Sequence, residues 1–326
     1  MLAIFLTFLI LIGSIAILAY SSHIAVTHSA SLAASLGLSS LVIGITLVSI
    51  GTDISEILNS IISCALGHGD IDVGDSVGSD LAQLTIIFGL LPIICGEFKV
   101  NKKSFLIIGA CEILSLILIF TIVEKGYFNR TDALFMMLSL IFYTLVTYNV
   151  TKSDKLTQVD LMLEKNIEKQ PKGKKHFLLF AIIGFFGATL SSYLIVQSVI
   201  YLSSRFNINE YIISFFMVSI GTSLPELSVN ISALKQKHYN LAIGNIIGSC
   251  IVDSTLSIGI GQALFPQEVS AQLIIPTIIY TLFASLIVFI TIGKKEKMDW
   301  KSGILFIGLY ALSFPSSLFI YNVLYL

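Results

Sequence analysis

The chain has 326 residues and a formal net charge of −1; 55% of its residues are hydrophobic and only 12% are charged. Soluble globular proteins carry about 25% charged residues, so this chain has too little charge to cover a water-exposed surface. The near-neutral charge also excludes the basic face on which nucleic-acid binding depends. We therefore predict a polytopic membrane protein. Its 4 cysteines lie in apolar stretches without paired spacing, which favours neither disulfide bonds nor a zinc site.

Ten apolar segments are each long enough to cross the hydrocarbon core of a bilayer, which is about 30 Å thick. Each is expected to be a helix, because a chain in lipid must satisfy its own backbone hydrogen bonds. The first segment lacks the basic start and the cleavage site of a signal peptide and is expected to be retained. An even number of spans places both chain ends on one side. The predicted spans are residues 2–20, 36–64, 72–95, 104–123, 131–150, 177–200, 208–234, 240–265, 270–292 and 302–325.

Basic residues divide sharply between the connections. Sixteen of the 19 Lys and Arg residues fall between spans 3 and 4, 5 and 6, 7 and 8, or 9 and 10. The other three are Lys125, Arg130 and Arg205, on the opposite side. Because cytoplasmic loops concentrate basic residues, we expect a plasma-membrane protein with both termini extracellular. The polar connection 151–175 is then a cytoplasmic linker between two five-span halves, residues 1–150 and 176–326.

A shift of 170 residues superimposes the sequence VSIGT at Val48–Thr52 on the same sequence at Val218–Thr222. Without a gap, it also pairs Glu56 with Glu226 and aligns Gly, Ser and Thr residues over more than 40 positions, which indicates an internal repeat. The copies cover about 41–90 and 211–260, in spans 2–3 and 7–8. Five spans separate them, so they enter the membrane from opposite sides. Such a 5+5 inverted-topology repeat typically places its binding site near the midplane.

Both copies carry carboxylates inside predicted spans. A charged residue at the centre of a membrane helix costs about 2.5 kcal/mol or more on insertion scales, so Glu56 and Glu226 each need a cation, a proton or a hydrogen-bond donor. Pro225 should break or kink span 7 beside Glu226. Thr222 lies four residues before Glu226, on the same helical face. The surrounding oxygens suit hard cations such as Ca²⁺ or Na⁺ and disfavour soft transition metals.

The sequences GTSLPE at Gly221–Glu226 and GNIIGS at Gly244–Ser249, followed four residues later by Asp253, closely resemble the α-repeat signature of the sodium/calcium exchanger family within the cation/calcium antiporter superfamily. The resemblance implies that family's fold, alternating-access antiport, and sliding of spans 1 and 6. It also implies that two Glu bridge a central divalent ion. The implied cation-binding positions are Thr52, Glu56, Ser79, Gln83, Thr222, Glu226, Ser249 and Asp253, with Ser223 at a further position whose partner in the first copy is Asp53.

The first copy departs from that pattern at four positions. Asp53 replaces the usual Ser, Ser55 the usual Pro and Asp75 the usual Asn, while Gln83 stands where relatives often have Asn or Asp. These changes leave the identity of the exchanged ions open. A structural interpretation also remains open for Asp53, Asp75 and Asp80, which could face a water-filled funnel. Glu112 in span 4 has no repeat partner and could be a packed acid.

We predict a secondary antiporter that exchanges Ca²⁺ for Na⁺ as a monomer in membrane lipid. No nucleotide-binding Walker A sequence is present, so ATP-driven transport is not expected. We expect no cofactor and no enzymatic activity, since the chain shows neither a catalytic nucleophile arrangement nor a metal triad. A proton-coupled antiporter is the first alternative. A cation channel is the second, although channels usually build their pores from rings of residues in an oligomer.

Overall fold

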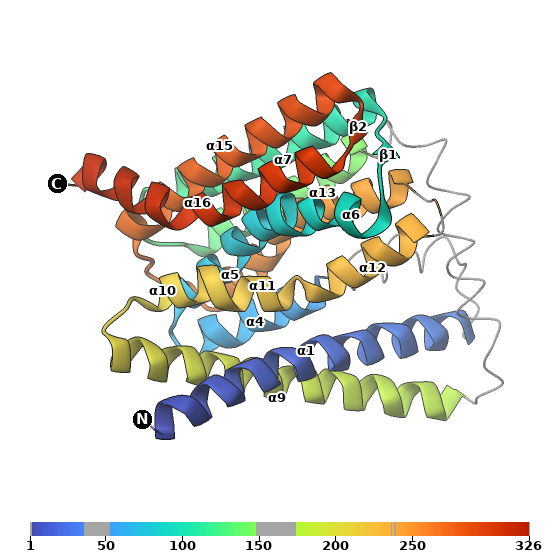
Figure 1. Cartoon of the computed structure of the whole chain (residues 1–326). Coiled ribbons are helices and arrows are strands. Elements are labelled where there is room, and N and C mark those ends of the chain that lie inside the picture. Colours follow the sequence, from blue (N-terminus) through green and yellow to red (C-terminus); the bar gives the residue numbers. More distant parts are fainter. Residues whose placement is uncertain (1, 36–52, 148–173, 236, 238, 326) are drawn as a thin grey trace.

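The computed structural model describes residues 2–35, 53–147, 174–235, 237 and 239–325. In this part of the chain, eight helices are long and apolar enough to cross a membrane. Together with two further helices, α4 and α16, they account for the ten predicted spans. Both chain ends lie at the same end of the bundle (Figure 1). The predicted all-α polytopic class is confirmed.

Six spans are uninterrupted helices. They are α1 (Leu2–Ser35), α7 (Lys102–Val123), the helix Arg130–Thr147, α9 (Lys174–Phe206), α15 (Ala271–Lys295) and α16 (Trp300–Tyr325). Span 2 is described only through α4 (Ile54–Ala65), because residues 36–52 lie outside the described part. Most of the predicted linker, residues 151–173, also lies outside it.

The spans that carry the repeat are interrupted. Span 3 consists of α5 (Gly69–Ala82), the π-helical segment η2 (Gln83–Ile87) and α6 (Phe88–Cys95). Span 7 consists of α10 (Glu210–Ile213), η3 (Ser214–Val218), α11 (Ser219–Thr222) and α12 (Leu224–Lys235). Span 8 consists of α13 (Tyr239–Val252), η4 (Asp253–Ser257) and α14 (Ile258–Leu264).

These interruptions repeat between the copies. The segments η2 and η4 begin at Gln83 and Asp253, which are 170 residues apart in the sequence. A π-helical turn inserts one residue into the helical repeat and is common at functional sites. In span 7 the α-helix breaks at Ser223, between α11 and α12. This break lies where Gly221 and Pro225 predicted one.

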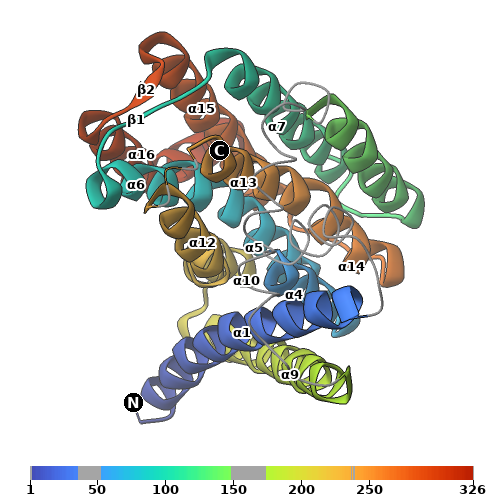
Figure 2. The same ribbon diagram turned by 90° about the vertical axis from the view of Figure 1, so that its right-hand side faces the viewer.

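α1 and α9 lie side by side at one edge of the molecule, below α4 in Figure 1, and cross each other at the lower edge of Figure 2. Gly184 of α9 permits this close approach, since a Cβ atom there would lie 2.5 Å from the backbone nitrogen of Ala25. The pair forms a small apolar core of its own with side chains of α5, α10 and η3. A larger core unites α5, α6, α7, α13, α15 and α16.

α1 extends 15 residues beyond the predicted end of the first span, which was wrong at residue 20. The apolar run is interrupted at Ser21, Ser22 and His23. Ser21 and Ser22 are nevertheless buried, as is Ala25. Small residues allow the close packing against α9, so polarity in this stretch marks a helix interface rather than the end of the helix.

The connections pair at opposite ends of the bundle. Strand β1 (Phe98–Lys99), between spans 3 and 4, pairs antiparallel with β2 (Lys297–Met298), between spans 9 and 10. Both belong to the basic set of connections, and they lie at the end away from the two termini (Figure 1). A bridge between Tyr127 and Glu268 joins two connections of the other set. Connections of the same predicted side therefore pair with each other, which agrees with the alternation of sides predicted from the basic residues.

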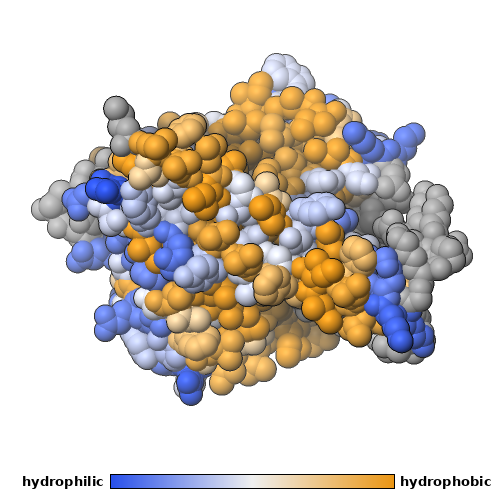
Figure 3. All heavy atoms as spheres, turned by 90° about the horizontal axis from the view of Figure 1, so that it is seen from below, coloured by the Kyte–Doolittle hydropathy of each residue, from blue (hydrophilic) through white to orange (hydrophobic). Residues whose placement is uncertain are grey.

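The surface has the character of a lipid-facing bundle. Many large apolar side chains are exposed on the outer helices, including Phe186 of α9 and Phe319 of α16. Seen from below, apolar side chains cover most of the face between its two ends, where hydrophilic side chains gather (Figure 3). Such exposed apolar area would be unfavourable in water and is expected in a bilayer.

Candidate cation-binding site

Glycines bring the two repeat copies into contact at the centre of the bundle. A Cβ atom at Gly78 of α5 would lie 2.3 Å from the carbonyl oxygen of Phe215, and one at Gly74 would lie 2.8 Å from that of Tyr211. Only glycine therefore lets α5 approach span 7 so closely. The approach brings Ser79 beside Thr222, with their hydroxyl oxygens 3.4 Å apart.

Two contacts lie between equivalent positions of the repeat. Gln83 Nε2 donates a hydrogen bond to Asp253 Oδ2 at 2.9 Å. The thiol of Cys250 approaches the carbonyl oxygen of Asp80 at 3.8 Å. Each pair is separated by 170 residues, and equivalent residues can touch one another only near the axis that relates the copies. The start of each π-helical segment thus lies at this axis.

Glu56 of α4 and Glu226 of α12 face this centre from opposite copies. Their side chains are almost completely buried, at 1% and 0% exposed. Ser55 Oγ donates to Glu56 Oε2 at 2.7 Å. Glu56 Oε1 and both carboxylate oxygens of Glu226 have no hydrogen-bond partner among the described residues. The two carboxylates lie within electrostatic range of each other and of Asp253.

The remaining predicted positions surround this pair. Thr222 Oγ1 donates to Asp75 Oδ1 at 2.9 Å. Asp53 is fully buried; the Ser249 hydroxyl lies close enough to interact with its carboxylate, whose oxygens have no hydrogen bond of good geometry in the described structure. The hydroxyl of Ser223 is likewise buried without a partner there. Thr52 lies outside the described residues.

No basic side chain of the described residues forms an ion pair with these carboxylates. The ion pairs of the described residues all lie toward the ends of the bundle, for example between Lys297 and Glu97 or between Lys125 and Asp132. A carboxylate that is buried without a partner is strongly unfavourable. The centre therefore requires bound cations or protons.

The geometry favours mixed oxygen ligands over a compact carboxylate cage. Within the described residues, no three Asp, Glu, His or Cys side chains converge as metal ligands. Hydroxyl, amide and backbone oxygens must therefore contribute to any cation site here. Such a ligand set is typical of hard cations.

Two contacts at this centre, and a third between α7 and α15 outside the proposed ligand set, were not predicted from the sequence. Asp75 accepts from Thr222, as described above. Asp80 accepts a short hydrogen bond from Ser254, and Glu112 Oε1 accepts one from Ser285 at 2.9 Å. The available signal was position alone, since Asp80 follows Ser79 directly. The bond to Ser285 agrees with the interpretation of Glu112 as a packed acid.

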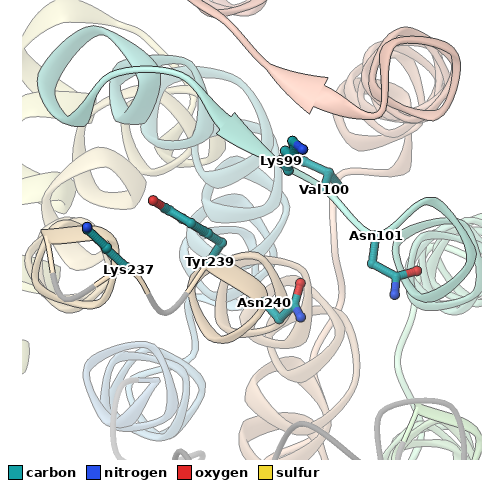
Figure 4. A pocket seen from close by; sticks show the side chains of 6 residues that line it. All are labelled: Lys99, Val100, Asn101, Lys237, Tyr239 and Asn240. Atoms are coloured by element: carbon teal, nitrogen blue, oxygen red, sulfur yellow. The ribbon is translucent and has the colours of Figure 1, made fainter.

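A cavity of about 350 Å³ lies elsewhere, at the end of the bundle that carries the basic connections (Figure 4). It is lined by Lys99, Val100, Asn101, Lys237, Tyr239 and Asn240. None of these is a carboxylate. The cavity is therefore distinct from the carboxylate centre, which is closed off from solvent.

Similarity to other proteins extends over nearly the whole chain. An uncharacterized membrane protein of Methanocaldococcus jannaschii, MJ0091, is 28% identical over 306 residues, covering 92% of this chain and 94% of its own. A structure of the sodium-calcium exchanger NCX_Mj, soaked with Na⁺ and Sr²⁺, is 25% identical with a TM-score of 0.58 and covers 96% and 99% of the two chains. The H⁺/Ca²⁺ exchanger CAX is 15% identical with a TM-score of 0.71, covers 98% and 86%, and shares the fold.

The family model described as "Sodium/calcium exchanger protein" matches residues 6–149 and 176–316, which together make up most of the chain. The two matched segments correspond to two repeated halves, as the inverted repeat predicted. The family consists of transporters, not enzymes, and the predicted resemblance is confirmed. The chain accordingly belongs to the sodium/calcium exchanger family, as a cation/Ca²⁺ antiporter with an NCX_Mj-like fold.

Proposed function

We propose that this protein exchanges Ca²⁺ for Na⁺ by alternating access, with Ca²⁺ held between Glu56 and Glu226. The supporting observation is the set of buried carboxylate oxygens of these two residues that lack any hydrogen-bond partner in the described structure. Two carboxylates neutralise one divalent cation. The remaining coordination, typically six to eight oxygens in all for Ca²⁺, can come from hydroxyl, amide and carbonyl groups nearby.

Na⁺ ions are proposed to compete for the same oxygens. The further ligand positions that we propose are Thr52, Asp53, Ser79, Gln83, Thr222, Ser223, Ser249 and Asp253. Since Na⁺ and Ca²⁺ would then exclude one another, movement of one ion would drive the other in the opposite direction. The use of Na⁺ and Sr²⁺ with the related NCX_Mj structure supports this pairing of a monovalent and a divalent cation.

α1 and α9 are proposed to slide along the bundle to open the site to either side. Most of their contacts are with each other, and their apolar core is separate from the larger one. Gly184 and Gly187 of α9 meet Ser21 and Ala25 of α1, which gives a smooth interface of small residues. The pair can therefore move as one unit.

A proton-coupled exchange is the second candidate, and Asp53 favours it. This chain has an additional buried carboxylate where the family usually has Ser, without a basic partner in the described residues. A proton could occupy that carboxylate in place of Na⁺.

Flux measurements in liposomes distinguish the two candidates. Purified protein is reconstituted and ⁴⁵Ca²⁺ uptake is followed under an imposed Na⁺ gradient or an imposed pH gradient, with choline replacing Na⁺ as the control. The proposal requires uptake that depends on the Na⁺ gradient. Uptake driven only by the pH gradient would establish proton coupling instead, and uptake without any counter-ion gradient would contradict antiport.

We further propose that the protein resides in the plasma membrane with both termini extracellular and the linker 151–175 in the cytoplasm. The distribution of basic residues supports this orientation. One chain should suffice for transport, because both copies of the repeat contribute to a single centre.

A further inference from the structure

A buried polar seam runs between α4 and α5 from the carboxylate centre toward the turn that joins the two helices. α4 contributes Asn59 and Ser60, and α5 contributes Asp72 and Asp75; none is more than 1% exposed. Asp75 contacts the centre through Thr222. Asp72 lies three residues earlier, about 4.5 Å farther along the helix axis. The seam thus continues beyond the proposed ligands.

Only one of the two carboxylate oxygens of Asp72 has well-formed hydrogen bonds in the described structure. Its Oδ2 atom accepts hydrogen bonds from Gln262 Nε2 at 2.8 Å and from the Cys64 thiol at 3.2 Å. Its Oδ1 atom has no hydrogen bond of good geometry in the described structure, and the Ser60 hydroxyl is the one group there that lies close enough to interact with it. Asn59 Oδ1 has no partner there, and the Ser60 hydroxyl has none apart from this contact with Asp72.

Asp75 differs, because both of its carboxylate oxygens accept hydrogen bonds. Asn59 Nδ2 donates to Oδ2 at 2.6 Å, and Thr222 Oγ1 donates to Oδ1 at 2.9 Å. None of the ion pairs in the described structure involves either acid. The unsatisfied part of the seam therefore consists of one carboxylate oxygen and two neutral oxygens.

The second copy lacks these features. Under the 170-residue shift, Ala242 stands in place of Asp72, and Asn230 and Asn245 stand in place of Ser60 and Asp75. Asn245 Nδ2 donates to Asn230 Oδ1 at 3.3 Å, so that seam is neutral, and its atom without a partner in the described structure is a nitrogen, Asn230 Nδ2. Since α12 and α13 pack together with Ala242 at the position of Asp72, the packing of α4 against α5 does not require the Asp72 carboxylate. Among the described residues, an unpaired carboxylate oxygen in this seam is a property of the first copy.

We propose that Asp72 Oδ1, Ser60 Oγ and Asn59 Oδ1 form an additional binding site for Na⁺, on the hairpin side of the carboxylate centre. One carboxylate with neutral oxygens matches the charge of a monovalent hard cation. Ca²⁺ would need more carboxylate ligands than the seam has free. This inference rests on the Na⁺ coupling proposed above.

An ion bound there would lie one helical turn from the centre, on the route to the turn between α4 and α5. The described residues of α12 and α13 hold no carboxylate between Glu226 and the turn that joins these two helices. Na⁺ should therefore be captured more tightly at the membrane face that carries the α4–α5 turn, which we call the hairpin face. The two faces of the transporter would then differ in apparent Na⁺ affinity.

The test compares Na⁺ dependence at the two faces. Na⁺-dependent ⁴⁵Ca²⁺ flux is measured in sealed vesicles of each orientation for wild type, Asp72→Ala and Asp72→Asn; Ala is the residue of the second copy. Loss of one charged contact should raise the half-maximal Na⁺ concentration at the hairpin face by about tenfold. The opposite face and the Ca²⁺ dependence should change by no more than about twofold.

Glu112→Gln is the matched control, because it removes another buried carboxylate that lies outside the seam. It should leave the half-maximal Na⁺ concentration unchanged at both faces. Equal shifts at the two faces, or no shift in either Asp72 variant, would overturn the additional site. If Asp72→Ala does not fold, the isosteric Asp72→Asn decides.

A binding measurement separates this inference from the proposed function. Thermal stability of the purified protein is followed during titration with NaCl or choline chloride. Na⁺-specific stabilisation that is present in wild type and weakened in Asp72→Asn supports the site, even if no Na⁺-driven flux is found. Identical Na⁺ titrations of the two proteins would refute it.

Discussion

Glu226 is a buried carboxylate that the described residues around it do little to stabilise. Neither of its oxygens has a hydrogen-bond partner in the described structure, and no basic side chain approaches it there. A side chain in this position is costly unless an ion or a proton joins it. The residue is therefore more easily explained by what it binds than by any contribution to folding.

Replacing Glu226 with Gln should reduce Ca²⁺ transport by about a hundredfold or more, because a hard divalent cation loses a charged ligand. Folding should be retained, since a neutral amide is no costlier to bury than the unliganded acid. The measurement is ⁴⁵Ca²⁺ flux in liposomes, with gel-filtration profile and thermal stability as the check on folding. Glu112→Gln, which removes a buried acid bonded to Ser285, is the control and should transport normally. Wild-type flux in a well-folded Glu226→Gln protein would assign the residue a structural role.

At the scale of residues, the sequence predicts contacts between equivalent positions of the repeat better than it predicts contacts between different positions. The constant offset of 170 already relates Gln83 to Asp253, and the structure brings these two side chains into contact. The bond from Thr222 to Asp75 connects different positions of the two copies. No offset reveals such a contact, because it depends on how deeply α5 settles against span 7.

At the scale of elements, most of the uninterrupted spans were predicted well, because hydrophobic length is their main signal in the sequence. α15 and α16 begin and end within three residues of their predicted limits. The π-helical segments were not predicted, since a π turn changes hydrogen bonding without a distinctive residue pattern. The continuation of α1 beyond residue 20 was not predicted either, because a partner helix rather than lipid covers its polar residues.

The α1–α9 contact provides a prediction at this scale. Gly184→Ala places a Cβ atom 2.5 Å from the Ala25 backbone nitrogen, so the helices must separate. We expect the free energy of unfolding to fall by about 1–3 kcal/mol, measured by thermal denaturation in detergent. Gly13→Ala in α1 is the matched control, because a Cβ atom there meets nothing within 4 Å. That variant should be neutral or stabilised by up to about 1 kcal/mol. Equal effects of both changes would show that the α1–α9 interface is not closely packed.

At the scale of the whole molecule, the structure shows which connections lie at the same end of the bundle. It does not show which end faces the cytoplasm. β1 with β2 and Tyr127 with Glu268 join connections of the same predicted side. Which end faces the cytoplasm depends on the translocation machinery, which reads the distribution of charge. The proposed orientation therefore needs a separate test.

Lys103 and Arg130 suit that test because both are exposed and lie at opposite ends of the bundle. Each is replaced by Cys in a background without the native cysteines, and intact cells are treated with a membrane-impermeant maleimide. Arg130→Cys should be labelled from outside, and Lys103→Cys should be labelled only after the cells are opened. The reverse pattern would place both termini in the cytoplasm.

Gln83 and Asp253 occupy equivalent positions, yet the bond between them requires unlike groups, since the amide donates and the carboxylate accepts. In a symmetric assembly, a residue on a twofold axis meets its own copy. Two second halves would place Asp253 against itself, with like charges and no donor. The halves of this chain are therefore no longer interchangeable. At this position a copy of the second half could therefore not replace the first, whereas a copy of the first could replace the second, because two Gln83 side chains can still donate to and accept from each other.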